Sequence, residues 1–156
     1  MKNIRGYTLI EMLVAVLLLS IILIGVYGVM TTGNNIFTRN IAMLDMEQQT
    51  RNAIDRIVRE VRQASSQTIT TNFNGTTNDR IMFTIPTAVG IQYYLSGTNL
   101  VREFPSGTIK IVASNINFLK FTLTGSLLQI QVQASQTISG ATTIFPLIEK
   151  VRLRNE

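Results

Sequence analysis

The chain has 156 residues, of which 46% are hydrophobic, and a formal net charge of +5 at pH 7. It contains no cysteine and no histidine, so disulfides, thiolate zinc sites and catalysis by Ser-His or Cys-His pairs are excluded. After a short leader and one segment of membrane length, about 125 residues remain, which is enough for one modest domain.

A basic leader and a long apolar run open the chain. Met12 to Met30 carries no charged residue, and at about 1.5 Å per helical residue it spans roughly 28 Å, close to the hydrocarbon thickness of a bilayer. Lys2 and Arg5 precede the run, and the next basic residue is Arg39. This asymmetry predicts that the N-terminal side is cytoplasmic. A cleavable secretory signal is disfavoured, because its apolar core is only about 7 to 15 residues long.

Between the leader and the apolar run lies Gly6-Tyr7-Thr8-Leu9-Ile10-Glu11. Glu11 sits at the edge of the run, where an unpaired carboxylate costs about 2 to 3 kcal/mol, so the sequence predicts a cation for it. Thr8 and Glu11 also form a Thr-x-x-Glu pattern, which is typical of a capping box at the start of a helix. Both interpretations of Glu11 stay open, although a cap does not explain the residues placed just before it.

This stretch resembles the N-terminal segment of type IV pilins and pseudopilins. In that family a prepilin peptidase cuts after the glycine, methylates the new amino terminus and leaves the apolar segment as anchor and assembly stem. The resemblance implies cleavage between Gly6 and Tyr7, N-methylation at Tyr7, and pairing of Glu11 with the amino terminus of a neighbouring subunit. The family usually has Phe where this chain has Tyr7. Loss of Lys2 and Arg5 would leave twelve basic against nine acidic side chains, a net charge of about +3.

Three glycines, Gly25, Gly28 and Gly33, interrupt the end of the apolar run. Each costs a helix about 0.5 to 1 kcal/mol relative to alanine. Many major pilins have proline where this chain has Gly28, so the resemblance implies a helix that melts there in the filament. Close helix packing in the membrane is the alternative.

A helical pattern resumes over about residues 34–64. Its apolar members recur at spacings of three and four, and they are Ile36, Phe37, Ile41, Leu44, Ile54, Ile57, Val58 and Val61. Opposite charges four residues apart, which indicate a solvated face, are Arg51 with Asp55, Asp55 with Arg59, and Arg56 with Glu60. Binding of a partner or a phosphate is the alternative role for Arg56, Arg59 and Arg62.

The rest of the chain is strand-like. Residues 65–79 are rich in Ser, Thr, Asn and Gln, which predicts a loop with one short strand near Ile69. Apolar runs then predict strands between about 80 and 154; they are Ile81 to Ile85, Ile91 to Leu95, Leu100 to Phe104, Ile109 to Ala113, Ile116 to Leu123, Leu127 to Gln133 and Ile144 to Leu153. Ser96 to Asn99 and Gly125-Ser126 predict tight turns between neighbouring strands.

One long helix followed only by strands predicts an α+β fold, in which the outer half of the helix packs on a C-terminal antiparallel β-sheet. The expected organisation is a cleaved leader at 1–6, a transmembrane and assembly helix at 7–32, and an outer domain at 33–156. This is the pilin architecture. The Arg-rich helix end, Tyr93-Tyr94-Leu95 and the closing residues 151–155 are similar to minor pilins and minor pseudopilins of the larger kind.

The sequence offers no residues for an enzyme, and no cofactor is expected. The nearest approach to a metal site is the loop around Gly75, with Asn72, Asn74, Asn78 and Asp79, which lacks the spacing of a calcium loop. The hypothesis is therefore a minor pilin or pseudopilin, processed by prepilin peptidase, that initiates or caps assembly of a type IV pilus or a type II secretion pseudopilus.

The resemblance implies three partners: other pilin or pseudopilin subunits, the prepilin peptidase and an inner-membrane assembly platform. It implies a single pass through the bacterial inner membrane, with the outer domain periplasmic or extracellular. One alternative is a competence-type pilin that binds DNA during uptake; against it, the arginines have acidic neighbours at helical spacing and no interleaved aromatic residues. Another is a signal-anchored outer domain that never assembles, which leaves Glu11 without a partner.

Overall fold

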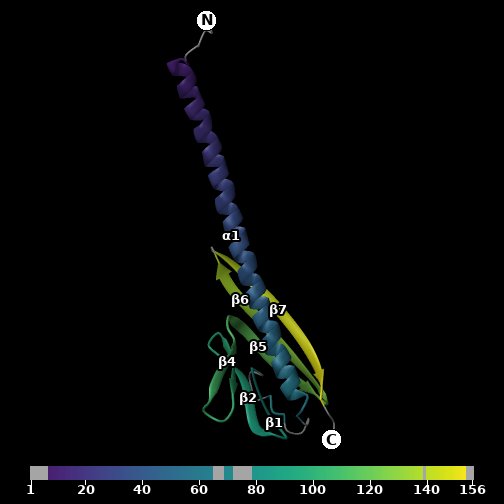
Figure 1. The fold of residues 1–156 in the computed structure, drawn as a ribbon. Helices are drawn as coiled ribbons and strands as arrows, with labels where there is room; N and C mark the ends of the chain where they lie inside the picture. Colours follow the sequence, from purple (N-terminus) through teal and green to yellow (C-terminus); the bar gives the residue numbers. More distant parts are fainter. Residues whose placement is uncertain (1–6, 65–68, 72–78, 139, 154–156) are drawn as a thin grey trace. The chain divides into compact units, whose positions relative to one another are not determined.

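The computed structural model describes residues 7–64, 69–71, 79–138 and 140–153. One helix, α1 (Leu9–Val61), precedes seven strands (Figure 1). The strands are β1 (Arg80–Ile85), β2 (Ala88–Ser96), β3 (Asn99–Glu103), β4 (Ile109–Ala113), β5 (Ile116–Thr124), β6 (Leu127–Ile138) and β7 (Ala141–Arg152). This order, with the helix packed on antiparallel strands, confirms the predicted α+β class.

The chain forms two compact units, Met1–Asn40 and Ile41–Glu156. In the first unit the described chain beyond Thr8 is all α1, and the helix continues without a break through Gly25, Gly28 and Gly33. A side chain added at any of these three glycines would meet nothing within 4 Å. Melting at the glycines concerns the filament and therefore stays a prediction.

In the second unit the strands form two antiparallel sheets rather than the single sheet predicted. The first has the order β1-β2-β3-β4 and the second the order β5-β6-β7. The division falls at Ser114 and Asn115, where only Asn115 has a positive φ, of 61°. The type I′ and II′ turns that are favoured in two-residue hairpins have positive φ at both central residues or at the first, so this connection matches neither, and β5 pairs with β6 instead of β4.

The predicted tight turns are present, and each contains a glycine with positive φ. Gly97 joins β2 to β3 with a φ of 61°, and Gly125 joins β5 to β6 with a φ of 58°. The predicted short strand near Ile69 is reduced to one bridge, between Thr70 and Met82. The part of the loop at residues 72–78 lies outside the described residues.

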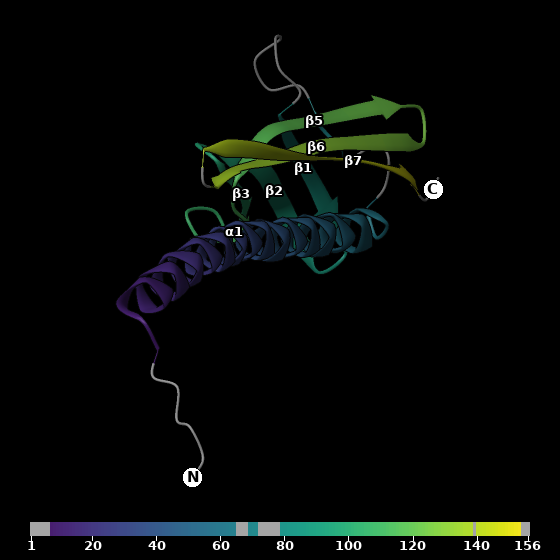
Figure 2. The ribbon, with the colours of Figure 1, turned by 90° about the horizontal axis from the view of Figure 1, so that it is seen from above.

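The core lies between the part of α1 from Met46 onward and the two sheets. The buried helix residues recur every three or four positions and are Met46, Thr50, Ala53, Ile54, Ile57, Val58 and Val61. All of them except Thr50 form one hydrophobic cluster with buried strand residues, the largest of which are Phe83, Tyr93 and Phe121. Figure 2 shows β5, β6 and β7 side by side.

The strict alternation predicted over Leu128 to Gln133 is confirmed. Leu128, Ile130 and Val132 are buried, whereas the glutamines between them are partly exposed. β7 repeats the alternation and forms the edge of its sheet, since it pairs only with β6, and it carries Pro146 near its middle.

The burial of α1 begins later than its apolar pattern predicts. Ile36, Phe37, Ile41 and Leu44 belong to the predicted amphipathic helix, yet they are 54%, 64%, 44% and 63% exposed. The strands of this chain cover the helix only from Met46 onward. The four apolar side chains therefore have no cover among the described residues.

Candidate processing and assembly site

Thr8 and Glu11 form the predicted capping box at the start of α1. The Thr8 backbone N–H and its hydroxyl both donate to Glu11 Oε2, at 2.8 and 2.9 Å, and the Glu11 N–H donates to Thr8 Oγ1 at 3.3 Å. The Thr8 carbonyl accepts the first helical bond, from the Met12 N–H at 3.3 Å. Thr8 is thus the N-cap, and two amides that the helix leaves without partners are satisfied reciprocally.

The capping box does not use the whole Glu11 carboxylate. All the hydrogen bonds of this carboxylate to described residues end on Oε2, so Oε1 is available to a cation from outside the chain. The two interpretations of Glu11 are therefore compatible. One oxygen holds the start of the helix, and the other can accept from a neighbour.

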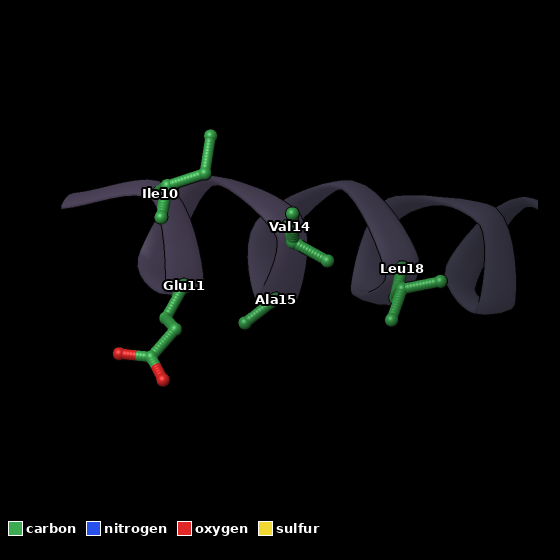
Figure 3. A pocket seen from close by; sticks show the side chains of 5 residues that line it. All are labelled: Ile10, Glu11, Val14, Ala15 and Leu18. Carbon is green, nitrogen blue, oxygen red and sulfur yellow. The ribbon is translucent and has the colours of Figure 1, made fainter. Parts of the chain in front are cut away.

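Glu11 borders a shallow apolar groove on the surface of α1 (Figure 3). The groove encloses about 310 Å³ and is lined by Ile10, Glu11, Val14, Ala15 and Leu18. Figure 3 shows Glu11, Ala15 and Leu18 on the same side of the helix, and the small Ala15 side chain follows one turn after the carboxylate. A carboxylate beside an apolar groove can accept a partner that combines a cation with an apolar chain.

Tyr7, the predicted methylation site, lies just before the cap and is 84% exposed. Gly6, Lys2 and Arg5 lie outside the described residues, so the predicted cleavage site and leader charges stay predictions. After Tyr7 the apolar side chains of α1 are exposed along its first half. Within the described residues, α1 is long and apolar enough to cross a membrane.

The second half of α1 contributes to a cluster of charged residues, of which the sequence predicted only one ion pair. The predicted pair of Arg56 with Glu60 is present at 3.4 Å. Glu60 also accepts from Arg102 Nε of β3, at 3.1 and 3.0 Å to its two oxygens. Arg102 is 42 residues away from Glu60 in the sequence, so no local spacing signals this pair.

Tyr93 lies beside this cluster with its ring stacked on Phe83, at 6.2 Å between ring centroids. Its hydroxyl is buried and forms no hydrogen bond of ordinary geometry with the described residues. Burial, with a smaller contribution from the nearby Glu60 carboxylate, raises the pKa of Tyr93 well above its ordinary value. The cluster therefore joins α1 to the first sheet.

The other predicted helix pairs differ from expectation. Arg51 binds Glu47 at 2.8 Å rather than Asp55, so that prediction is wrong. Glu47 precedes its arginine by four residues, which is the more favourable orientation on a helix. Asp55 and Arg59 form no ion pair in the described structure. Groups of acidic, Cys or His residues that could hold a metal ion are absent from the described residues.

In a comparison with known families, the family described as the prokaryotic N-terminal methylation motif matches residues 1–27. These residues include the predicted cleavage site, Tyr7, Glu11 and most of the apolar run. The match supports the assignment of the chain to the type IV pilin and pseudopilin family. Comparison with curated proteins and with solved structures gave no match.

The motif supports a pilin-type or pseudopilin-type subunit that prepilin peptidase processes, and it suggests that peptidase and other pilin subunits as partners. One apolar helix near the N-terminus fits a membrane-anchored protein.

Proposed function

We propose that this chain is a minor pilin or minor pseudopilin, a structural subunit without enzymatic activity that initiates or caps a type IV pilus or a type II secretion pseudopilus. It crosses the bacterial inner membrane once, with its N-terminus cytoplasmic and its outer domain periplasmic or extracellular. An inner-membrane assembly platform then transfers it into the filament. The residues that carry this role are Gly6 and Tyr7 for processing and Glu11 for assembly.

The observation that carries the proposal is the length of uncovered apolar helix. Exposed apolar side chains follow α1 from Leu9 to Met30 and recur, after a polar interval, from Ile36 to Leu44. The whole stretch is about 36 residues and therefore about 54 Å of helix. A bilayer covers only about 30 Å. An anchor that never assembled would leave Ile36, Phe37, Ile41 and Leu44 in water, whereas helices of neighbouring subunits would cover them.

Glu11 supports the same conclusion from the other end of the helix. Its Oε1 has no partner in the described chain, and an uncompensated carboxylate at the rim of the bilayer is costly. The methylated amine expected at Tyr7 of a neighbouring subunit is a cation of suitable size for Oε1. The bordering groove would take the apolar residues that follow that amine.

The test separates membrane insertion from assembly. Glu11→Ala removes the carboxylate and should leave cleavage and membrane retention normal, because the anchor becomes more apolar. The variant should nevertheless be depleted from sheared filaments, or from crosslinks to sister subunits. Asp45→Ala, which removes an exposed acidic residue of the same helix, should assemble normally.

Thr8→Ala distinguishes the charge from the cap. It removes the two capping hydrogen bonds that use the Thr8 hydroxyl but keeps the carboxylate. If Glu11 acts through its charge, Thr8→Ala should assemble far better than Glu11→Ala. Equal assembly of both variants, at the level of the unaltered chain, would leave Glu11 as a cap only.

A further inference from the structure

A polar groove runs between the last turns of α1 and the edge strand β7. It is lined by Asn52, Asp55, Val58, Arg59 and Arg62 of the helix and by Glu149 of β7, and it encloses about 560 Å³. The helix positions are three, four or seven residues apart, so they share one side of α1. All six residues lie in the compact unit Ile41–Glu156.

The charged side chains of this groove form no ion pairs within the described fold. Arg56, on the adjacent side of the helix, is bound to Glu60. In contrast, Arg59 and Arg62 form no ion pair or hydrogen bond with any described residue, and neither do Asp55 and Glu149. Two guanidinium groups and two carboxylates therefore line one open groove without partners among the described residues.

The composition of the groove limits what it can bind. A guanidinium presents a planar fork of donors that matches a carboxylate, and Asp55 and Glu149 can each accept from a cation. The four charges sum to zero. A polyanion such as DNA would gain from two arginines and be repelled by two carboxylates, so it has little to gain here. A protein surface that carries both an acidic and a basic side chain satisfies all four groups.

We propose that this groove docks the outer domain of a neighbouring subunit of the same filament, through one acidic and one basic side chain of that neighbour. The inference rests on the proposed function, because it requires an assembled filament. It adds a polar contact between outer domains to the apolar contact between helices. Such a contact selects the neighbour by charge, since a partner with the charges reversed would bring like charges together.

The absence of cysteine from the chain allows the contact to be tested at single positions. In the full chain, Asn52→Cys places a benzophenone label in the groove, and Phe37→Cys places the same label on the uncovered apolar part of α1. After irradiation of assembled filaments, Asn52 should capture a chain that mass spectrometry identifies by a methylated N-terminus of pilin type. Capture of nucleic acid, or of no such subunit, overturns the proposal.

The two labels distinguish the failure of this inference from that of the proposed function. Capture of a sister subunit from Phe37 but not from Asn52 keeps the assembly role and rejects the groove. Capture from neither position rejects both.

Charge reversal tests the chemistry of the contact. Arg62→Glu and Glu149→Arg should each lower capture from Asn52 by at least about fivefold, because each brings a like charge to the partner. Lys120→Glu is the matched control, since Lys120 is exposed and lies on β5, outside the groove. It should leave capture unchanged. Capture that is insensitive to both groove reversals would show that the charges are only solvated.

Discussion

Glu60→Gln tests how the C-terminal part of α1 is held against the first sheet. Glu60 accepts from Arg102 Nε of β3 at 3.1 and 3.0 Å and from Arg56 Nε at 3.4 Å. The side chains of Arg102 and Glu60 retain 16% and 19% of their accessible surface. Replacement of Glu60 by glutamine keeps the shape and removes the negative charge, so two guanidinium groups lose their common partner.

The burial of the pair sets the size of the effect. Removal of one partner from a fully buried ion pair costs about 3 to 5 kcal/mol, whereas an exposed pair contributes about 0.2 to 1 kcal/mol. Because Glu60 and Arg102 are mostly but not fully buried, we expect Glu60→Gln to lower the free energy of unfolding by about 2 kcal/mol. Glu47→Gln is the matched control on the same helix, since its partner Arg51 is 54% exposed. It should cost less than about 0.5 kcal/mol.

Urea unfolding followed by circular dichroism measures both variants, with the chain from Gly33 onward as the common background. A double-mutant cycle with Arg102→Met isolates the coupling between the two side chains, because the effect that each substitution has independently of the other cancels. Costs for Glu60→Gln and Glu47→Gln that agree within about 0.5 kcal/mol would refute the reasoning that burial makes the Glu60 pair important.

Three further predictions concern processing, folding and pH. Gly6→Val should block leader cleavage, because a bulky side chain prevents close approach of the peptidase to the bond; mass spectrometry of the membrane fraction should show the intact leader, and a normal Tyr7 terminus would contradict this. The chain from Gly33 should fold as a monomer with helix and strand content, whereas a disordered or purely helical spectrum would reject the fold. Burial raises the pKa of Tyr93, so the folded state keeps a proton that the unfolded chain releases near pH 10, and stability should fall as the pH rises above about 10. Tyr93→Phe should flatten that fall and, by removing a buried hydroxyl without a regular partner, should leave neutral-pH stability equal or higher.

Local patterns predicted most of the elements because their causes are local. The periodicity of α1 and the glycines at Gly97 and Gly125 act within a few residues of the chain. The division into two sheets was not predictable in the same way, because it depends on which strands pair in the folded domain. The ion pair of Glu60 with Arg102 depends on tertiary packing, so no local spacing in the sequence predicts it.

At the candidate site, too, the sequence predicted only the features that have local causes. Thr8 and Glu11 are three residues apart, so their capping box was predictable from the sequence. The apolar spacing of Ile36, Phe37 and Leu44 resembles that of the buried residues further along α1. Apolar periodicity indicates that one face of a helix is packed, but it does not indicate whether the same chain or another chain packs against that face. Only the structure shows that the strands of this chain cover the helix from Met46 onward.

Pro146 hinders the pairing of β7 with strands of other molecules when such subunits are crowded together. β7 is a twelve-residue strand with an open edge, and an open edge of that length invites a second strand to pair and start an aggregate. A proline in an edge strand offers no amide hydrogen to an incoming strand. It leaves only five residues of β7 before it and six after it for uninterrupted pairing. In the proposed filament, domains held side by side at high local concentration could then associate through side chains without their sheets pairing.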